Sequence, residues 1–457
     1  SGEALSRVVA FGTTVYLARV LGAGSYGLIA LAAGVNLYLA KAADFGIESM
    51  GAQEIARAGG ELSTHSRFVS AVIGVRLLLT LGLIGLAVLV VHFAVSSPQR
   101  EVLTLYFLLL VPIAASTKWV HIGRQEARPI GLTRIFGEVL ALSIVALVVR
   151  GVGDVWLVPV AQLAGDSSVV LMLSALLVRA GLRLRPRLDF AAAWPTFRRA
   201  MPLTAQSVLG LVIYNSDIMF LRALRDSASV GYYASAYTLI SFLANLGVAH
   251  GTSLLPALAK LHQDPAAERA LFQGALARTF AVAFPVVVGG SLVAAGVIEL
   301  AFGKAYAPAA PVLQVLMWSV LASTARGVCG PALIARGSQK LLLYSNIYGV
   351  VLNLSANTLL ITRYGMYGAA IATVLTEFFG FLWVALRYIP REGLGGLPLA
   401  RFAKPFVSGL AMAAVVVLLN GQHVIVRVVA GGAVYAGCML ALGAIRLRKG
   451  ALPSLEV

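Results

Sequence analysis

The sequence is poor in charge and in cysteine, and it lacks the common signatures of nucleotide and metal chemistry. Only 12% of its 457 residues are charged, against roughly 25% in an average soluble domain, so a soluble globular protein is excluded. Both cysteines, Cys329 and Cys438, lie in apolar runs, and we interpret them as small apolar fillers rather than as a disulfide or a metal site. No GxxxxGKS/T, HExxH or CxxC pattern occurs, so no ATPase or metal centre is recognisable.

The chain also lacks a long polar segment that would form a domain in water. Its longest polar connection has about twenty residues, whereas functional sites of enzymes are commonly carried by extended loops. We therefore expect a protein that is not an enzyme, with no catalytic residues and no cofactor.

Long apolar runs dominate what is present. Hydrophobic residues make up 59% of the chain, and the runs reach about 20 residues, the length that spans a bilayer. They predict an all-α integral membrane protein of about fourteen transmembrane helices, which begin near residues 4, 26, 70, 102, 131, 154, 201, 231, 272, 308, 341, 366, 401 and 424. The chain starts at Ser1 without a charged leader, so we expect a trimmed start and targeting through the membrane segments themselves.

The basic residues indicate orientation rather than nucleic-acid binding. Lys and Arg number 36 against 19 Asp and Glu, a net charge of +17, and these cations punctuate the apolar runs instead of clustering on one wetted face. Most of those outside the spans fall in connections on the side of the termini, so the positive-inside rule predicts a multi-pass protein of the cell (inner or plasma) membrane with both termini in the cytoplasm. One connection alone holds Arg179, Arg183, Arg185, Arg187, Arg198 and Arg199. Trp119, Trp156 and Trp194 lie near segment ends, as interfacial aromatic residues do.

Short motifs repeat at corresponding places in the helix count. GRQ at 123–125 recurs as GSQ at 337–339, FG at 136–137 recurs as YG at 348–349, and SYGLIA at 25–30 recurs as SVGYYA at 229–234. The repeats predict an N-terminal lobe at 1–180 and a C-terminal lobe at 201–390, each of six helices, with a basic cytoplasmic linker at 181–200 and two extra helices at 391–457. Lobes related in this way typically enclose a central cavity that opens to alternate sides.

Charged residues inside the predicted spans are the first candidates for a site, because each costs at least about 2.5 kcal/mol at mid-depth unless it has a partner or a wet cavity. Lys41, Asp44 and Glu48 follow at i, i+3 and i+7, so we expect them on one face of a helix. This stripe is either a self-paired cluster or the wall of a cavity to which Arg7 and Arg326 add positive charge. Arg76 lies near the cytoplasmic end of its helix and is expected to extend to the interface.

Acids near mid-span form a second group of candidates. Asp166 and Glu377 are separated by about the repeat offset, so the same place in both lobes carries a carboxylate. They are either hydrogen-bonded structural groups or a proton or Na⁺ site that couples transport to a gradient. Asp217 is a third ion-coupling candidate, and Glu138 and His250 are further embedded polar residues. We expect a packed, hydrogen-bonded role for His250.

Several motifs resemble a known family. LARVLG at 17–22, YG at 26–27, DFGI at 44–47 and QEIAR at 53–57 are similar to the opening of the polysaccharide-export (Wzx-type) flippases of the MOP superfamily. In the second half, Asp217, VGYY at 230–233 and FGKAY at 302–306 resemble later motifs of the same family. The resemblance implies movement of an undecaprenyl-pyrophosphate-linked oligosaccharide from the inner to the outer leaflet.

The MurJ branch, which flips lipid II, is also similar in places. SRV at 6–8, the position of Lys41, LGVA at 246–249 and LLP at 254–256 resemble its motifs. One departure is YYASA at 232–236, where that branch carries a cavity arginine after Tyr-Tyr-Ala. We therefore place the oligosaccharide flippase first and the lipid II flippase second.

The resemblance and the embedded cations together suggest a mechanism. A pyrophosphate headgroup requires cationic partners inside the membrane, and Arg7, Lys41, Asp44 and Arg326 are the candidate lining of its cavity, with transport by alternating access. We expect a monomer that contacts its lipid-linked substrate, membrane lipids and, through the family, polysaccharide polymerases and glycosyltransferases. A MATE-like cation antiporter, which would use the embedded acids, and a membrane polymerase or ligase stay open as alternatives.

Overall fold

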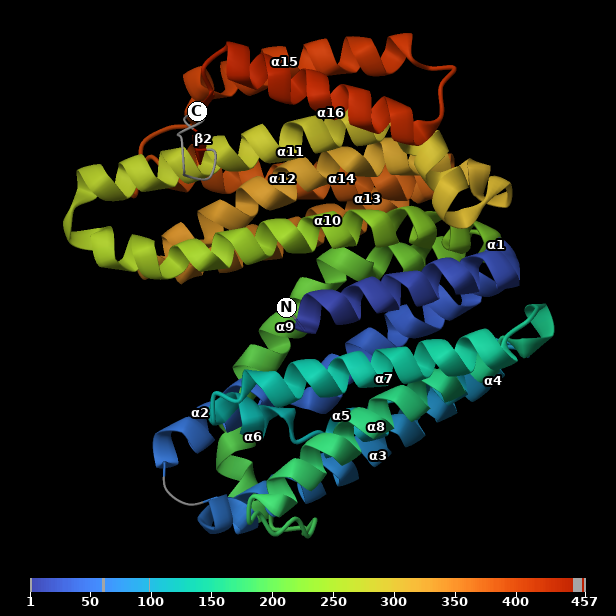
Figure 1. The fold of residues 1–457 in the computed structure, drawn as a ribbon. Helices are drawn as coiled ribbons and strands as arrows, with labels where there is room; N and C mark the ends of the chain where they lie inside the picture. The colour runs from blue at the N-terminus through green and yellow to red at the C-terminus, as the bar shows by residue number, and fades with distance from the viewer. Residues whose placement is uncertain (1, 60–61, 98, 447–453, 456–457) are drawn as a thin grey trace. The chain divides into compact units, whose positions relative to one another are not determined.

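The structure is a computed structural model that describes residues 2–59, 62–97, 99–446 and 454–455. The chain divides into two compact units, of which unit 1 comprises Ser1–Arg222 with Asp226–Gly231 and unit 2 comprises Ala223–Arg225 with Tyr232–Val457. Helices make up nearly all of the regular structure (Figure 1). The predicted all-α class is confirmed, while the lobe and linker boundaries drawn from the sequence stay a prediction.

Unit 1 is built from nine α-helices, counted over its described residues, and two short 3₁₀ turns. Its elements are α1 (Gly2–Asp44), α2 (Ile47–Ala58), η1 (Leu62–His65), α3 (Ser66–Ala94), α4 (Gln99–Phe107), α5 (Leu110–Ala115), α6 (Lys118–Gly123), α7 (Ala127–Val148), η2 (Val152–Asp154), α8 (Leu157–Arg179) and α9 (Phe190–Leu224). One apolar cluster joins α1, α4, α7 and α8, and a second joins α2, α3, α6 and the first part of α9.

Unit 2 continues with long helices and ends in a short antiparallel pair of strands. Its elements are α10 (Ser227–Lys260), η3 (Leu261–Gln263), α11 (Pro265–Phe302), η4 (Lys304–Ala309), α12 (Ala310–Ala335), α13 (Gln339–Tyr364), α14 (Met366–Leu382), a π-helical turn η5 (Trp383–Tyr388), α15 (Leu399–Leu418), α16 (Val424–Ala441), β1 (Ile445–Arg446) and β2 (Ser454–Leu455). Residues of α11, α12 and η5 form its main core, and α15 with α16 packs on α11.

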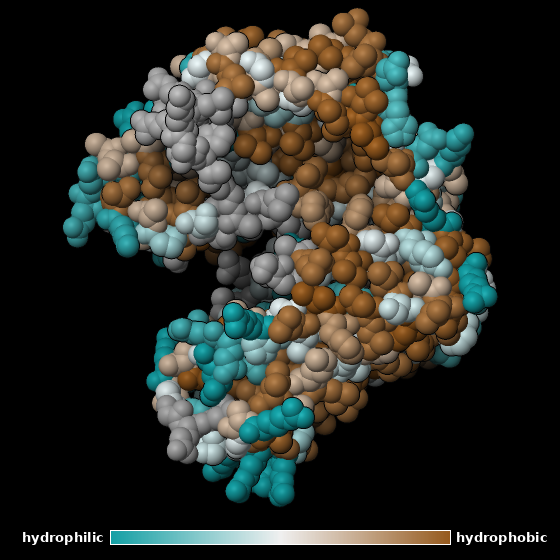
Figure 2. All heavy atoms as spheres, viewed as in Figure 1, coloured by the Kyte–Doolittle hydropathy of each residue, from teal (hydrophilic) through white to brown (hydrophobic). Residues whose placement is uncertain are grey.

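Lipid-facing surfaces distinguish these helices from those of a soluble bundle. Ten segments of the described chain are long and apolar enough to cross a membrane. In the most apolar 18-residue window of Ser63–Ala94 only 11% of the residues are buried, so most of the apolar side chains in that window face lipid. Figure 2 shows hydrophobic side chains over the flanks of the helices and hydrophilic ones gathered near their ends.

Every segment predicted from the sequence coincides with a described helix. Gly22, with φ 69° and ψ 170°, interrupts α1 and divides it into the first and second predicted helices. The helices α9, α10 and α13 are not among the ten apolar segments, so the count of fourteen spans stays a prediction.

Two equivalent motifs of the sequence repeat pack against each other in unit 1. A Cβ atom on Gly27 would overlap the carbonyl oxygen of Ser227, and one on Gly231 would overlap that of Ala23. Only glycine permits the start of α10 and the second arm of α1 to approach so closely.

The aromatic residues at segment ends differ in burial. Trp156 and Trp194 are about half exposed, as expected for interfacial residues, whereas Trp119 is 1% exposed and packs in the core of unit 1. The interfacial interpretation of Trp119 is therefore wrong, because α6 packs against α2 and the Trp119 ring meets Phe68 of α3 edge to face.

Candidate functional site

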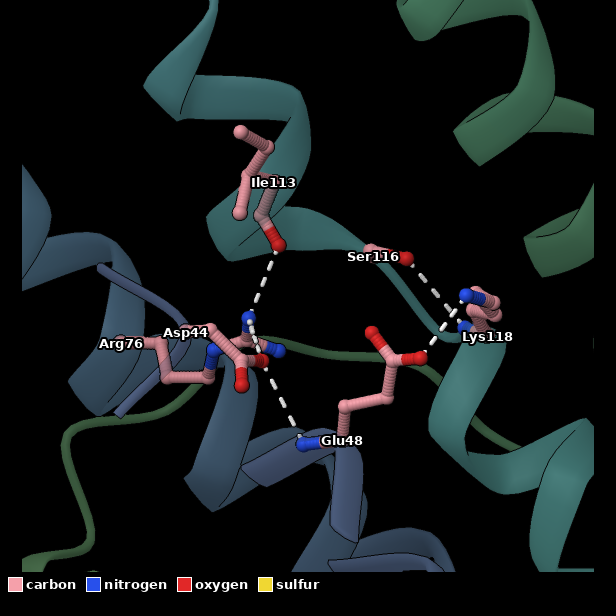
Figure 3. Close-up of polar contacts among 6 residues, drawn as sticks. All are labelled: Asp44, Glu48, Arg76, Ile113, Ser116 and Lys118. Atoms are coloured by element: carbon pink, nitrogen blue, oxygen red, sulfur yellow. Dashed lines mark hydrogen bonds and ion pairs between the residues drawn. The ribbon is translucent and has the colours of Figure 1, made fainter. Parts of the chain in front are cut away.

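Asp44 lies at the junction where α1 ends and α2 begins, and it holds the guanidinium of Arg76 from α3 (Figure 3). Arg76 Nη2 is 3.2 Å from Asp44 Oδ1 and also donates to the carbonyl of Ile113 at 2.9 Å. The Arg76 side chain is only 2% exposed, against 20% for Asp44. The expectation that Arg76 extends to the interface is therefore wrong, since its charge is compensated inside unit 1 by a carboxylate and a helix-end carbonyl.

The backbone between Asp44 and Glu48 explains why the predicted charged stripe is broken. Phe45 and Gly46 both have positive φ, 49° and 69°, so α1 stops at Asp44 and α2 starts in a new direction. The backbone N–H of Glu48 donates to Asp44 Oδ1 at 3.3 Å. This bond satisfies one of the N–H groups in the first turn of α2 that have no partner within the helix. Because two left-handed residues interrupt the helix, the expectation of one continuous helical face is wrong.

Glu48 finds a different partner, Lys118 at the start of α6. Lys118 Nζ is 2.8 Å from Glu48 Oε1, and the backbone N–H of Lys118 donates to Ser116 Oγ at 3.3 Å (Figure 3). Both charged side chains are close to half exposed. The two acids of this region are thus each taken by a cation that the sequence did not associate with them.

Lys41 and Arg7 are, with Arg19, the basic residues of α1. The side chains of Lys41 and Arg7 are exposed. Lys41 acts electrostatically on Asp44, yet no ion pair that includes Lys41 occurs among the described side chains. Since Arg76 and Lys118 already occupy the two acids, the charge of Lys41 is available to an anion.

A second embedded charge group joins α7 to α8. Arg134 is 3.1 Å from Asp166 and 2.6 Å from Glu138, four residues further along α7. Arg134 lies in the second turn of α7, seven residues after its start at Ala127. Glycine makes this contact possible, because a Cβ on Gly165 would lie 2.6 Å from the backbone oxygen of Gly137 on α7.

Unit 2 contains the counterpart of this group around Glu377 of α14. Arg326 from α12 is 3.6 Å from Glu377, and its Nη2 donates to Asn346 of α13 at 2.5 Å. Glu377 is 4% exposed and Arg326 is 17% exposed. A Cβ on Gly380 would lie 3.0 Å from the Arg326 guanidinium, so glycine leaves room for it.

The repeat offset of 212 would have identified part of this arrangement. It aligns Arg134 with Asn346, and Asp166 lies about the same distance before Glu377. Each unit therefore compensates its mid-helix acid with an arginine, but unit 2 takes that arginine from α12 and keeps an amide at the position of Arg134. The offset locates the acid, whereas only the packing of α12 identifies the cation.

Asp217 and His250 differ in what can be described. Asp217 of α9 is 1% exposed and acts electrostatically on Tyr38 of α1. The side chain of His250 lies outside the described residues. No group of three or more His, Cys, Asp or Glu side chains that could hold a metal ion occurs in the part of the chain that the structure describes.

The electrostatic arrangement favours anions over cations. Asp44 and Glu377 each contact an arginine, and Asp166 shares Arg134 with Glu138. An organic cation would have to displace an arginine to reach them. A phosphate-bearing group meets exposed cations instead, and charged hydrogen bonds to phosphate are among the stronger ones in proteins.

Comparison with known proteins places the chain among membrane proteins of glycan assembly. The profile of a family described as "Polysaccharide biosynthesis protein" matches residues 1–262. From Haloferax volcanii, the "Probable low-salt glycan biosynthesis flippase Agl15" is 21% identical over 371 residues, which are 79% of this chain and 76% of the relative. The "Probable flippase AglR" of the same organism is 28% identical over 241 residues, and the match spans half of each chain.

Solved structures with the same fold include a lipid II flippase and a drug transporter. The lipid II flippase MurJ in an inward closed conformation superposes with a TM-score of 0.78 over 96% of this chain and 97% of that one, at 16% identity. An inward-facing MATE family transporter of the MOP superfamily gives a TM-score of 0.64 over 85% of this chain and 95% of that one, also at 16% identity. At such identity the likeness establishes the fold alone.

Proposed function

The chain belongs to the polysaccharide biosynthesis protein family, and on this basis we propose that it is a flippase for a lipid-linked oligosaccharide. The resemblance of its motifs to the polysaccharide-export flippases is thereby confirmed at the level of the family. The finer proposal is an undecaprenyl-pyrophosphate carrier whose sugar moves from the inner to the outer leaflet. No bond needs to be made or broken for this transfer, so the protein acts as a transporter and not as an enzyme.

The observation that carries the proposal is the surplus of positive charge on α1. Asp44 and Glu48 are held by Arg76 and Lys118 at 3.2 and 2.8 Å, and the exposed Lys41 takes part in no ion pair among the described side chains. A pyrophosphate carries at least two negative charges and cannot enter hydrocarbon without such partners. We assign headgroup contact to Lys41 and Arg7, with Asp44 as the residue that fixes the geometry of the end of α1.

We propose that Arg326 and the embedded acids couple transport to a proton or Na⁺ gradient. Protonation of Glu377 would remove the counter-charge of Arg326 and release its guanidinium for the cargo. Arg134 would be released only when both Asp166 and Glu138 were protonated, because it pairs with both. Asp217 is the third proposed coupling residue. The cycle is alternating access, in which an inward-open state accepts the lipid-linked sugar and an outward-open state delivers it.

Topology and partners are part of the same proposal. A multi-pass protein of this composition would lie in the cell membrane with both termini in the cytoplasm, because its basic connections are on that side. We propose a monomer that receives its substrate from glycosyltransferases and delivers it to a polymerase.

The test is transfer of a labelled polyprenyl-pyrophosphate oligosaccharide across proteoliposomes. Wild type is compared with Lys41→Gln, Arg7→Gln and the double variant, and we expect the double variant to lose transfer. Arg150→Gln serves as the matched control, because Arg150 is an exposed cation of unit 1 at the far end of α7. Full transfer by the double variant would refute the proposed headgroup site.

The same vesicles separate the alternatives. Faster transfer of lipid II than of the oligosaccharide carrier would assign the chain to the lipid II activity. Exchange of an organic cation for protons, with no lipid transfer, would support the antiporter and refute the flippase.

A further inference from the structure

Residues 182–189, which connect α8 to α9, form an extended strap that is fixed along α3. Gly181 has φ +99°, which allows the backbone N–H of Leu182 to donate to the carbonyl of Leu177. This hydrogen bond closes the C-terminal end of α8. The strap then follows α3 through hydrogen bonds to two serine residues. Arg183 N–H donates to Ser66 Oγ at 3.0 Å, and Ser70 Oγ donates to the carbonyl of Arg183 at 3.1 Å.

Ser70 also accepts hydrogen bonds from the next residues of the strap. Its Oγ accepts the N–H of Arg185 at 3.1 Å and its carbonyl accepts the N–H of Arg187, also at 3.1 Å. One turn further, Gly74 lets the strap touch the helix, because a Cβ there would overlap the carbonyl of Arg187. The backbone of the strap is therefore held at a defined register.

Between residues 182 and 185 the side chains alternate between the core and the exposed side, as they do along a β-strand. Leu182 is 1% exposed and Leu184 is partly buried, and both pack in the core that α3 shares with α6. Arg183, Arg185 and Arg187 are exposed. With a rise of about 3.3 Å per residue, the three guanidinium groups start roughly 6.6 Å apart on one side.

Little negative charge opposes these arginines. The nearest acid in sequence, Asp189, is bound by Arg67 at 2.9 Å and caps α9 through the N–H of Ala192 at 3.1 Å. Among the described side chains, Arg183 and Arg185 take part in no ion pair, while Arg187 acts electrostatically on Asp189.

The first turns of α9 add exposed apolar side chains directly beside the arginines. Phe190, Trp194 and Met201 are 45%, 51% and 58% exposed, whereas Ala193 and Phe197 on the other side of the helix are buried. Leu188 of the strap is 62% exposed. A row of cations followed by exposed aromatic and aliphatic residues is typical of the headgroup layer, where arginines meet phosphates and aromatic rings enter the interface.

We propose that Arg183, Arg185 and Arg187 form a binding strip for the phosphate groups of anionic phospholipids in the adjacent leaflet. Leu188, Phe190 and Trp194 insert beside it. Exposed aromatic residues would gain nothing from a soluble phosphate, so the occupant is a lipid and not a free anion. This role is independent of the transported substrate. It implies that anionic lipid is retained through the arginines of the strap, and not through the net charge of the protein alone.

The test is native mass spectrometry of the full chain in detergent with phosphatidylglycerol or with phosphatidylcholine of the same acyl chains. Each arginine near an anionic surface strengthens binding by about fivefold, so the triple variant Arg183→Gln, Arg185→Gln, Arg187→Gln should weaken retention of phosphatidylglycerol by up to about a hundredfold. The control triple Arg150→Gln, Lys304→Gln, Arg363→Gln removes equal charge from exposed sites elsewhere, and we expect unchanged retention.

A second pair of variants tests the register without changing the charge. Gly74→Ala displaces the strap and should weaken retention, whereas Gly82→Ala in the same helix, with nothing within 4 Å of its Cβ position, should not. Ser70→Ala, which removes two of the hydrogen bonds to the strap, replaces Gly74→Ala if that variant fails to fold.

Several results would overturn the proposal. They are full retention by the arginine triple, equal losses in both triples, and displacement of the lipid by an equal concentration of inorganic phosphate. A Leu188→Cys reporter in a Cys438→Ser background should be protected from a water-soluble thiol reagent in phosphatidylglycerol proteoliposomes. Protection by a cell extract alone would assign this face to a protein partner instead.

Discussion

Removal of the charge on Asp44 should destabilise the protein more than removal of its partner Arg76. Asp44→Asn keeps an oxygen for the N–H of Glu48 and for Arg76 Nη2, but it leaves a guanidinium that is 2% exposed with the Ile113 carbonyl and no carboxylate in contact. Arg76→Met keeps the packing of the stem and leaves a carboxylate that is 20% exposed and still accepts an amide. The more deeply buried charge should suffer more from the loss of its partner.

Magnitudes follow from this difference in burial. Loss of one partner from a buried ion pair costs about 3–5 kcal/mol of unfolding free energy, which we expect for Asp44→Asn. For Arg76→Met we expect about 1–3 kcal/mol, the cost of an incompletely satisfied polar group. The double variant leaves no charge, so it should be less destabilised than the sum of the single variants by about 2 kcal/mol.

The assay is unfolding by SDS in mixed micelles, followed by circular dichroism. Glu48→Gln is the matched control from the same cluster, and because its pair with Lys118 is close to half exposed we expect a change within about 0.5 kcal/mol. Wild-type stability in Asp44→Asn, or losses that simply add in the double variant, would refute the reasoning that the pair compensates a buried charge.

Two further predictions concern the packing of unit 1 and its response to acid. Gly27→Ala should lower the unfolding free energy by about 1–3 kcal/mol, because its Cβ would overlap the Ser227 carbonyl. Gly24→Ala in the same helix, with nothing within 4 Å of its Cβ position, should be neutral or stabilising. Equal melting temperatures of the two variants would contradict this reasoning. Hydrogen bonds from Arg67 and from the N–H of Ala192 lower the pKa of Asp189 in the folded protein. The ionised carboxylate therefore contributes to the free energy of unfolding above the pKa of an unfolded Asp, about 3.9, and this contribution is lost as the pH falls through the lower pKa of the folded state. Hydrogen exchange of the strap, corrected for intrinsic rates, should therefore accelerate below about pH 4 in wild type, and the same acid step in Asp189→Asn would rule out this carboxylate.

Composition and periodicity predicted the class of the molecule and the location of its helices. Apolar runs near the length of a bilayer leave a chain no alternative to helices, because backbone groups in lipid must be satisfied within their own segment. The position of mid-helix acids in both units also followed, since Asp166 and Glu377 stand about one repeat apart. Family membership followed from motifs such as DFGI at 44–47.

The pairing of charges could not be predicted in the same way. Lys41, Asp44 and Glu48 have helical spacing, but the left-handed backbone of Phe45 and Gly46 separates them and sends the acids to Arg76 and Lys118. Nothing in local spacing distinguishes a carboxylate that is free from one that meets an arginine 32 residues later in the chain.

The sequence by itself determined that this protein is a helical membrane protein of the polysaccharide biosynthesis family, because transfer of apolar segments into lipid depends on local composition. Only the tertiary structure decided which embedded charges are compensated and which stay exposed, as for Arg76 against Lys41. Charge compensation depends on distances between helices far apart in the chain. Those distances are set by close approaches such as Gly27 of α1 to α10 and Gly74 of α3 to the strap, where the absence of one side-chain atom determines which surfaces can meet.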